Sequence, residues 1–190
     1  MPRFFKYSSW LAASTLASSC QSVLSTEAML SVLMSAESQT WKYVGRDVLG
    51  QLGGLLVMSG LTKYTDKNPD RFLWVSHGFQ QASMGLVMYT SCLTPEWFLP
   101  VAALANVCAN VSFIGYGSIN AKCIQKLSVD KNNVGELYSK LTMQQTLAST
   151  MGLSLGMVLN EHCAMDARLL FIGLGLVRVY CCNKAVRTVL

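Results

Sequence analysis

Polar side chains recur inside the apolar segments of this 190-residue sequence, and their types and spacing could carry chemistry. At helical spacing they fall on three faces, one for each segment: Asp47 with Gln51, His77 with Gln81, and Asn106 with Asn110. One interpretation is a polar path for a substrate, in which His77 titrates and Asp47 is its charged partner. The other is hydrogen bonding between helices, worth roughly 0.6 kcal/mol for each bond. The faces offer only one carboxylate and one histidine, which favours hydrogen bonding.

Motifs for catalysis and metal binding are absent from the sequence. It contains no nucleophile elbow with a Ser-His-Asp order, no H-E-x-x-H and no nucleotide fingerprint. His162 stands between Glu161 and Cys163, but an ordinary histidine in a short loop explains that cluster better. The cysteines form no C-x-x-C pair and lie mostly in or beside apolar runs, which predicts buried thiols. We therefore expect no enzymatic activity, no metal and no cofactor.

Glycines recur at the spacing that lets two helices approach closely. Gly50 and Gly54 form one G-x-x-x-G motif, and Gly152 and Gly156 form another. On membrane helices such motifs bring backbones together, so that packing itself drives association. These four glycines are the predicted helix-packing residues. The glycine-rich run around Gly53 is not a phosphate loop, because the Lys-Ser/Thr pair of that motif is missing.

The elements that position these residues are apolar helices. Hydrophobic residues make up 52% of the chain and charged residues 13%, against about 25% charged residues in soluble domains. The mean hydropathy is +0.35. The segments long or apolar enough to approach a bilayer span are 8–36, 44–61, 72–93, 97–119, 147–159 and 169–182. The sequence thus predicts an all-α, polytopic transmembrane helical bundle with about five to six membrane segments in a single domain, 1–190.

The basic residues alternate along this division. Twelve of the fifteen would lie on one side of six spans, together with both termini, as the positive-inside rule requires. The connections expected over 62–71 and 120–140 supply most of them. Within these connections the predicted contacts to lipid headgroups are Lys63, Lys67, Arg71, Lys122 and Lys126. The net charge of +5 is better explained by anionic lipid than by nucleic acid.

The N-terminal region allows two interpretations. Residues 1–19 contain Arg3 and Lys6, many serines and no acidic residue, which is typical of an organellar presequence or of a basic flank before a membrane segment. The following stretch to Ala36 is either one polar span or two interfacial helices that meet at Ser25-Thr26-Glu27, a capping signal.

Several ordered blocks share their sequence pattern with one known family. They are Leu24–Leu30, Trp41–Gly54, Asp66–Arg71, Phe98–Pro100 with Ala105–Val107, and Asn132–Glu136 with Ser139, Lys140 and Gln144. Over residues 20–160 the chain therefore resembles the root UVB sensitive (RUS) family of eukaryotic membrane proteins. The second block is similar to the family pattern W-x-x-[KR]-D-G-x-G-Q-L-G with one shift in spacing.

The chain also departs from that pattern. Acidic and Asn-Asp positions of the family are His77, Gln80 and Gln81 here, a Ser-Gln-Glu element is Met143-Gln144-Gln145, and the family's C-terminal region is missing. The resemblance implies a helical organellar membrane protein, linked in some members to vitamin B6 balance and auxin distribution. It provides no catalytic residues to carry over.

Two functions follow as expectations. The first is a non-enzymatic accessory subunit of a larger organellar membrane complex, such as a respiratory complex, with lipid and other subunits as partners. The second is a transporter or permeability protein for a small metabolite related to vitamin B6. The loss of ionisable family positions and the short chain favour the subunit. The expected location is the mitochondrial inner membrane, with a plastid membrane or endomembrane as alternatives.

Overall fold

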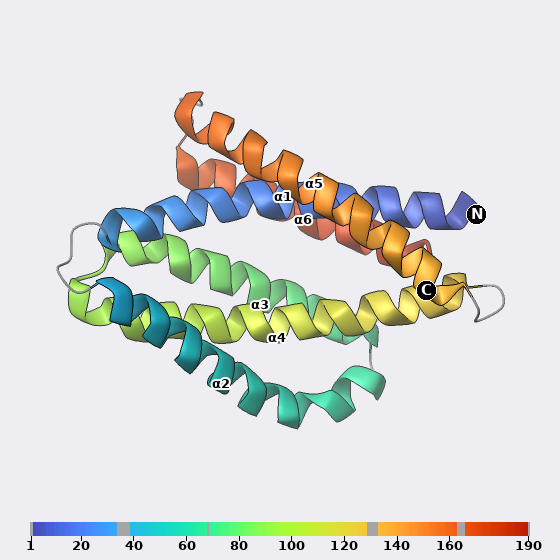
Figure 1. Ribbon diagram of the computed structural model, residues 1–190, viewed down its shortest axis with the longest axis horizontal. Coiled ribbons are helices and arrows are strands. Elements are labelled where there is room, and N and C mark those ends of the chain that lie inside the picture. Colours follow the sequence, from blue (N-terminus) through green and yellow to red (C-terminus); the bar gives the residue numbers. More distant parts are fainter. Residues whose placement is uncertain (1, 34–38, 68, 129–132, 163–165, 190) are drawn as a thin grey trace. The chain divides into compact units, whose positions relative to one another are not determined.

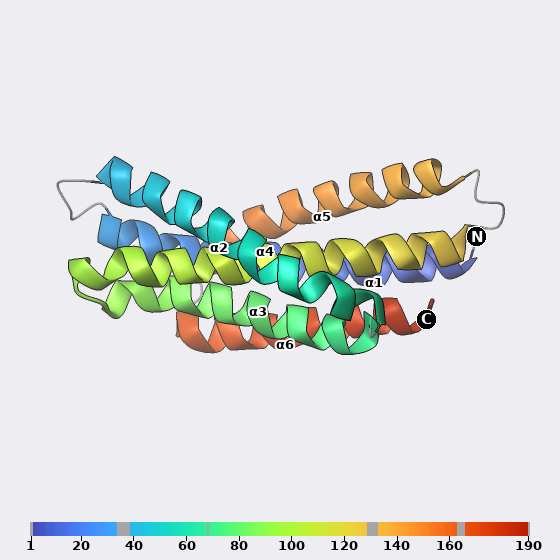
Figure 2. The same cartoon turned by 90° about the horizontal axis from the view of Figure 1, so that it is seen from below.

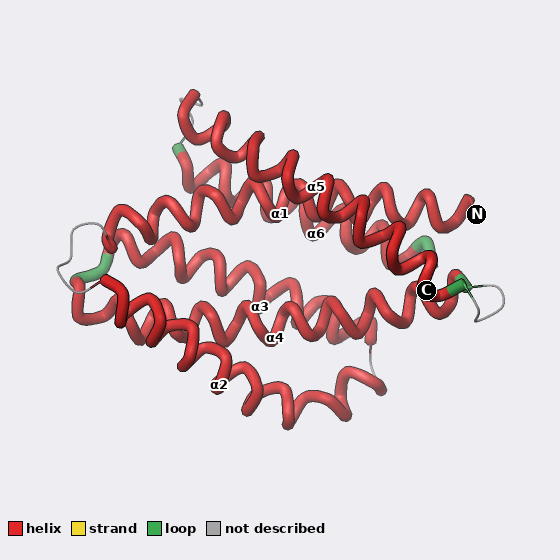
Figure 3. Tube along the Cα trace, in the orientation of Figure 1, coloured by secondary structure: helices red, strands yellow, loops and turns green. Residues whose placement is uncertain are grey.

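The computed structural model is built from helices throughout the residues it describes, which are 2–33, 39–67, 69–128, 133–162 and 166–189 (Figures 1 and 3). Side chains are described for these residues except 31–33, 39–43, 58, 62–67, 69–70 and 95. The helices are α1 (Pro2–Leu33), α2 (Gln39–Lys67), α3 (Pro69–Tyr89), α4 (Pro95–Leu127), α5 (Val134–His162) and α6 (Ala167–Arg187). A short 3-10 helix, η1 (Thr90–Cys92), follows α3. The all-α prediction is confirmed.

The helices are longer than the apolar segments that predicted them. Helix α2 continues to Lys67 and α3 begins at Pro69, so the polar connection expected over 62–71 is mostly helical. The basic connection expected over 120–140 is shortened in the same way, because α4 continues to Leu127 and α5 resumes at Val134. Lys and Asn residues are accepted on the exposed face of a helix, and a change of polarity alone does not end one.

The capping signal at Ser25-Thr26-Glu27 was misleading, since α1 passes through it without a break. A serine or threonine can satisfy its hydroxyl on the preceding turn of the helix instead of capping a new one. Ser22, for example, donates to the carbonyl of Ser19 at 2.8 Å. With no Gly or Pro nearby to interrupt the backbone, the helix continues.

Local chemistry explains where several helices begin. Proline occupies the first position of both α3 and α4, where its missing N–H costs nothing. The Asp166 carboxylate caps α6 by accepting from the N–H of Arg168 at 2.9 Å. Helix α5 has Glu136 in its first turn, near the positive end of the helix dipole.

The chain divides into two compact units. Unit 1 comprises residues 1–24 and 120–190, and unit 2 comprises residues 25–119. Unit 1 therefore combines the first part of α1 with the end of α4, α5 and α6. Unit 2 contains the rest of α1, α2, α3 and most of α4. Figure 2 shows the same helices turned by 90° about the horizontal axis.

Each unit buries its own apolar residues. In unit 2, Phe72 of α3 packs on Val111 of α4, and Met29 of α1 packs on Phe98 and Ala102 of α4. In unit 1 the fully buried side chains include Tyr7, Cys123 and Ile124. Five of the six described cysteines are buried, as predicted, whereas Cys92 in η1 is exposed. Cys163 lies outside the described residues.

Two of the described helices are long and apolar enough to cross a bilayer. They are α4, over Glu96–Leu127, and α6 over its whole length. The other helices fall below that level because polar residues interrupt their apolar runs. Large hydrophobic side chains are nevertheless exposed on them, for example Leu55 and Leu56 on α2 and Leu147 and Met157 on α5.

Candidate functional site

The polar residues of unit 2 lie where α2 crosses α4, and glycines set the distance between the two helices. A Cβ added at Gly54 would lie 2.7 Å from the Cβ of Asn110, and one at Gly53 would lie 2.5 Å from Cγ2 of Val107. A Cβ at Gly50 would overlap the Asn106 side chain. Side chains of α4 therefore occupy the space that these glycines leave open.

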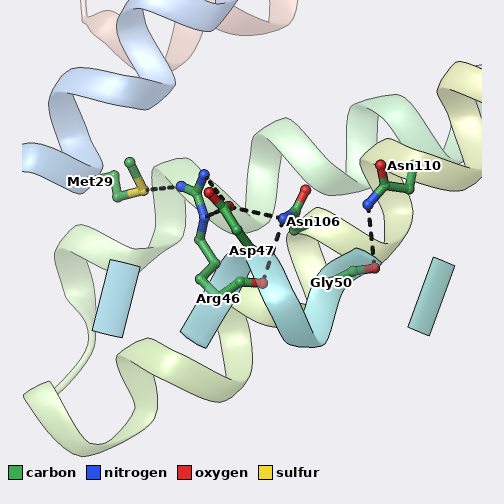
Figure 4. Close-up of polar contacts among 6 residues, drawn as sticks. All are labelled: Met29, Arg46, Asp47, Gly50, Asn106 and Asn110. Atoms are coloured by element: carbon green, nitrogen blue, oxygen red, sulfur yellow. Dashed lines mark hydrogen bonds and ion pairs between the residues drawn. The ribbon is translucent and has the colours of Figure 1, made fainter. Parts of the chain in front are cut away.

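Arg46, Asp47 and Asn106 form a charged network at this crossing (Figure 4). The Nη2 and Nε atoms of Arg46 lie 2.9 and 3.0 Å from Oδ1 of Asp47. The same oxygen accepts from Nδ2 of Asn106 on α4, at 3.1 Å. The remaining Nη1 of Arg46 donates to the sulfur of Met29 on α1, at 2.9 Å. One carboxylate thus joins α2 to α4, and its own arginine extends the contact to α1.

Asn110 repeats the contact one turn further along α4. Its Nδ2 donates to the main-chain carbonyl of Gly50 at 3.3 Å, and Figure 4 shows it next to the first network. A helical carbonyl can accept this second bond because it has a second lone pair. Both asparagines therefore donate to α2 across the glycine face.

Gln51 departs from the expectation that this polar face turns inward, because its side chain is exposed. The periodicity of the helix explains why. Gly50 and Gly54 lie at the centre of the contact, and Asp47 lies at its edge with its side chain 39% exposed. Gln51 is four residues after Asp47, which rotates it about 40° further from the contact.

His77 lies in the second polar cluster, between α3 and α4. It is 3% exposed, and its Nδ1 forms a hydrogen bond with the hydroxyl of Tyr116. The two rings meet edge to face with centroids 5.3 Å apart, and the Trp74 ring lies 6.0 Å from the histidine. A phenol thus binds the buried imidazole, while Asp47, the charged partner expected in a transport path, binds Arg46 and Asn106.

The glutamines beside His77 have different roles. Gln80 accepts from the hydroxyl of Ser112 on α4 at 2.8 Å, while Gln81 is half-buried on α3. A close approach supports this contact, because a Cβ added at Gly115 would meet Ser76 and Phe72 of α3. The α3–α4 pair is therefore held by side-chain hydrogen bonds over a glycine contact, as the α2–α4 pair is.

In unit 1 the second glycine motif lies directly against the backbone of α1. A Cβ added at Gly152 would lie 2.5 Å from the carbonyl oxygen of Leu16 and 2.8 Å from Cβ of Ser19. At Gly156 it would lie 3.0 Å from Cα of Cys20. Helices α1 and α5 therefore approach backbone to backbone at this point (Figure 1).

Small polar groups of α1 complete the contacts of unit 1. The thiol of Cys20 donates to the Gly152 carbonyl at 3.0 Å, and the hydroxyls of Ser19 and Ser149 lie 2.9 Å apart. Toward α6, the Ser14 hydroxyl donates to the Arg178 carbonyl at 3.1 Å, and Gln21 donates to the Phe171 carbonyl at 3.2 Å. Ser14 and Ser19, two of the serines that suggested a presequence, therefore form contacts between helices of unit 1. The Tyr7 hydroxyl likewise donates to Asn120 at 2.9 Å.

Arg178 of α6 lies in the interior of unit 1. The residue is only 6% exposed, and its main-chain carbonyl accepts from the Ser14 hydroxyl. Cys182 lies one turn further along the same helix, close enough to interact with it electrostatically.

The residues predicted to contact lipid headgroups lie in different settings. Arg71 and Lys126 are exposed near helix ends, and Lys122 is half-buried on α4. The side chains of Lys63 and Lys67 lie outside the described residues. Among the residues that the structure describes, no three metal-ligating side chains gather into a site.

Reasoning from the sequence missed four participants. Tyr116 and Ser112 lie in the apolar run of α4 and gave no signal, because one hydroxyl in such a run is common. Arg46 was noted only as a charge near the start of a segment, and Met29 only as part of a block. The i, i+4 spacing of Asn106 and Asn110 indicated a shared face, but not that α2 packs against it.

Comparison with known proteins assigns the chain to a protein family. A family model described as "Vitamin B6 photo-protection and homoeostasis domain" matches residues 1–190. Because the match covers the whole chain, this protein belongs to that family, the root UVB sensitive proteins. The resemblance seen in the sequence is confirmed.

Individual relatives come from Arabidopsis thaliana. Protein root UVB sensitive 3 is 27% identical over 195 residues, covering 98% of this chain and 44% of the relative. Protein root UVB sensitive 4 is 25% identical over 163 residues, covering 83% of this chain and 31% of the relative. The chain thus spans less than half the length of either relative. No solved structure matches it.

Proposed function

We propose that this protein is a non-enzymatic integral membrane protein of an organelle that serves as an accessory subunit of a larger membrane complex. One observation carries the proposal: the polar groups inside the helices of unit 2 bond to one another across helix pairs. Asp47 is bound by Arg46 and Asn106, and His77 by Tyr116. Polar groups committed to holding helices together favour a structural role over a path for substrates.

Membrane embedding is supported by two further observations. Helices α4 and α6 have the length and hydropathy of spans, and large apolar side chains are exposed on α2 and α5. In water such faces are a liability, whereas lipid or apolar subunits cover them favourably. We propose that the remaining helices cross as well, giving six spans with both termini on one side. The basic, serine-rich start of the chain favours the mitochondrial inner membrane.

The position of Cys92 separates six crossings from two. In a six-span arrangement the α3–α4 connection lies on the side opposite the termini. If only α4 and α6 cross, this connection and both termini share one side. A variant that retains Cys92 as its single cysteine is labelled in sealed vesicles with a membrane-impermeant maleimide. Protection of a terminal tag together with labelling of Cys92, or the reverse, supports six spans. Equal accessibility of the terminal tag and Cys92 contradicts a six-span arrangement.

The subunit role is tested by native electrophoresis after extraction in mild detergent. The protein should migrate with a large complex of fixed stoichiometry. The variants Gly53→Ala and Gly173→Ala make a matched comparison. A Cβ added at Gly53 meets Val107, whereas one added at Gly173 meets nothing within 4 Å. The first variant should deplete the complex and the second should not. Migration of the wild-type protein as a free small species would contradict the proposed subunit role.

A second candidate is movement of a vitamin B6 compound across the membrane. The description of the family domain names vitamin B6 homoeostasis, and His77 is a buried titratable group beside Tyr116. Uptake of pyridoxine into vesicles that contain the purified protein tests this role. His77→Ala and Asp47→Asn should abolish uptake, while Gln51→Ala, at an exposed position, should not. Unchanged uptake in both variants contradicts transport.

A further inference from the structure

Charge is distributed unequally between the two ends of unit 1. The beginning of α1, the end of α4, the beginning of α5 and the end of α6 lie at the same end (Figures 1 and 2). Basic side chains from all four helices are exposed there: Arg3, Lys6, Lys126, Lys140, Lys184 and Arg187. They are far apart in the sequence, and only the fold brings them to one end.

Acidic residues do not balance this end. Glu136 is the acidic side chain described there, and it binds Lys140 at 2.5 Å. Between α4 and α5 the sequence contains Asp130 and Lys131, and their opposite charges cancel. The opposite end of unit 1 contains Glu161 and Asp166 with Arg168. The positive surplus is therefore confined to the end that holds both termini.

We propose that this end of unit 1 binds the anionic headgroups of phospholipids, an inference that rests on the proposed membrane location. Lysines predominate among the six exposed basic residues. A lysine ammonium acts as a point charge on a flexible stem, whereas arginine forms a fork that selects one geometry. The cluster thus suits a layer of mobile, negatively charged headgroups better than one stereospecific ligand. Juxtamembrane basic residues gain from such a layer within the Debye length.

The fluorescence of Trp10 can report this contact. Of its four tryptophans only Trp10 belongs to unit 1. Its ring meets Tyr180 edge to face with centroids 5.9 Å apart, and Nζ of Lys184 lies 5.7 Å from the centroid of Tyr180. Lipid bound at the basic end therefore lies near an intrinsic fluorophore, which brominated lipid quenches on contact.

The full chain with Trp41, Trp74 and Trp97 each changed to Phe is reconstituted into phosphatidylcholine vesicles. A fraction of the lipid is either brominated phosphatidylcholine or brominated phosphatidylserine. Quenching by the zwitterionic lipid reports embedding, and the additional quenching by the anionic lipid reports the inferred contact. We expect phosphatidylserine to be preferred about fivefold at low salt, and the preference to fall in about 0.5 M NaCl.

Charge variants distinguish this contact from general lipid exposure. Changing Lys6, Lys126, Lys184 and Arg187 to Gln should remove the preference, whereas Arg168→Gln at the opposite end should leave it intact. Two results overturn the inference. One is equal quenching of Trp10 by the two lipids in the protein with its basic residues intact, and the other is a phosphatidylserine preference that survives the four changes. If neither lipid quenches Trp10, the proposed membrane location fails as well, so the two failures are told apart.

Discussion

The two units hold their helices together in different ways. In unit 2 the glycines of α2 face side chains of α4, and Gly115 of α4 faces side chains of α3. Side-chain amides and a carboxylate form the hydrogen bonds between these helices. In unit 1 the glycines of α5 face the backbone of α1, and hydroxyl and thiol groups donate to main-chain carbonyls. The second arrangement brings backbones closer and uses smaller polar groups.

This difference determines what each contact tolerates. A side chain can change its rotamer to admit a new methyl group, whereas a helix backbone can only move as a whole. The G-x-x-x-G motif of α5 should thus be the stricter of the two. The motif of α2 should accept changes when its neighbour on α4 is made smaller.

The largest effect is expected from Gly152→Leu. The new side chain starts 2.5 Å from the Leu16 carbonyl oxygen, so α1 and α5 must separate. We expect a loss of about 3 kcal/mol in the free energy of unfolding, measured by circular dichroism in mild detergent. Gly173→Leu on α6 is the control, because nothing lies within 4 Å of its added Cβ. Equal stability of the two variants would show that the backbone contact is unimportant.

A double-mutant cycle examines the α2–α4 contact. Gly53→Ala should cost about 1–2 kcal/mol, because its Cβ lies 2.5 Å from Cγ2 of Val107. Val107→Ala removes that methyl group and leaves the nearest atom, Cβ, at 3.7 Å. The double variant should therefore be more stable than the sum of the single changes predicts, by about 1 kcal/mol. Strict additivity of the two losses would contradict the packing described for unit 2.

Loss of one amide should have a smaller effect. Asn106→Leu removes the donor to Asp47, whose carboxylate keeps the Arg46 contact and remains partly exposed. About 1 kcal/mol of stability should be lost in the same unfolding measurement. Gln51→Leu, at an exposed position four residues after Asp47, serves as the reference and should be close to neutral. A stabilised Asn106→Leu variant would show that apolar packing outweighs the network.

The smallest effect concerns the exposed pair at the start of α5. The hydrogen bond from Lys140 lowers the pKa of Glu136 below its ordinary value. A lowered folded-state pKa adds stability that is present above the ordinary pKa and is lost as pH falls through the folded value. Glu136→Gln should therefore lower the melting temperature slightly at pH 7 and leave it unchanged in strong acid. A larger effect in acid would reverse the assigned sign.

The sequence predicted the helical class and the glycine and asparagine faces, because each depends on composition or on spacing within one helix. Partners could not be predicted in the same way. Nothing in the spacing of Asn106 indicates that Gly50 faces it, since that depends on how two helices cross. The His77–Tyr116 pair was missed for the same reason. The connection expected over 120–140 was too long, because polar residues there continue α4 to Leu127 instead of ending it. Of the two interpretations of residues 8–36, the continuous helix is the one observed.

The composition of unit 1 has a consequence for the order of synthesis. The first 24 residues pack against residues 120–190, and the hydrogen bond from Ser14 to the Arg178 carbonyl spans 164 positions. At typical elongation rates α1 must wait roughly ten seconds before α5 and α6 emerge. During that time its buried serines, Gln21 and Tyr7 lack the carbonyl and amide acceptors that they have in the folded unit. Helix α1 is thus made well before the helices that complete its contacts, and until then it lacks its hydrogen bonds to them.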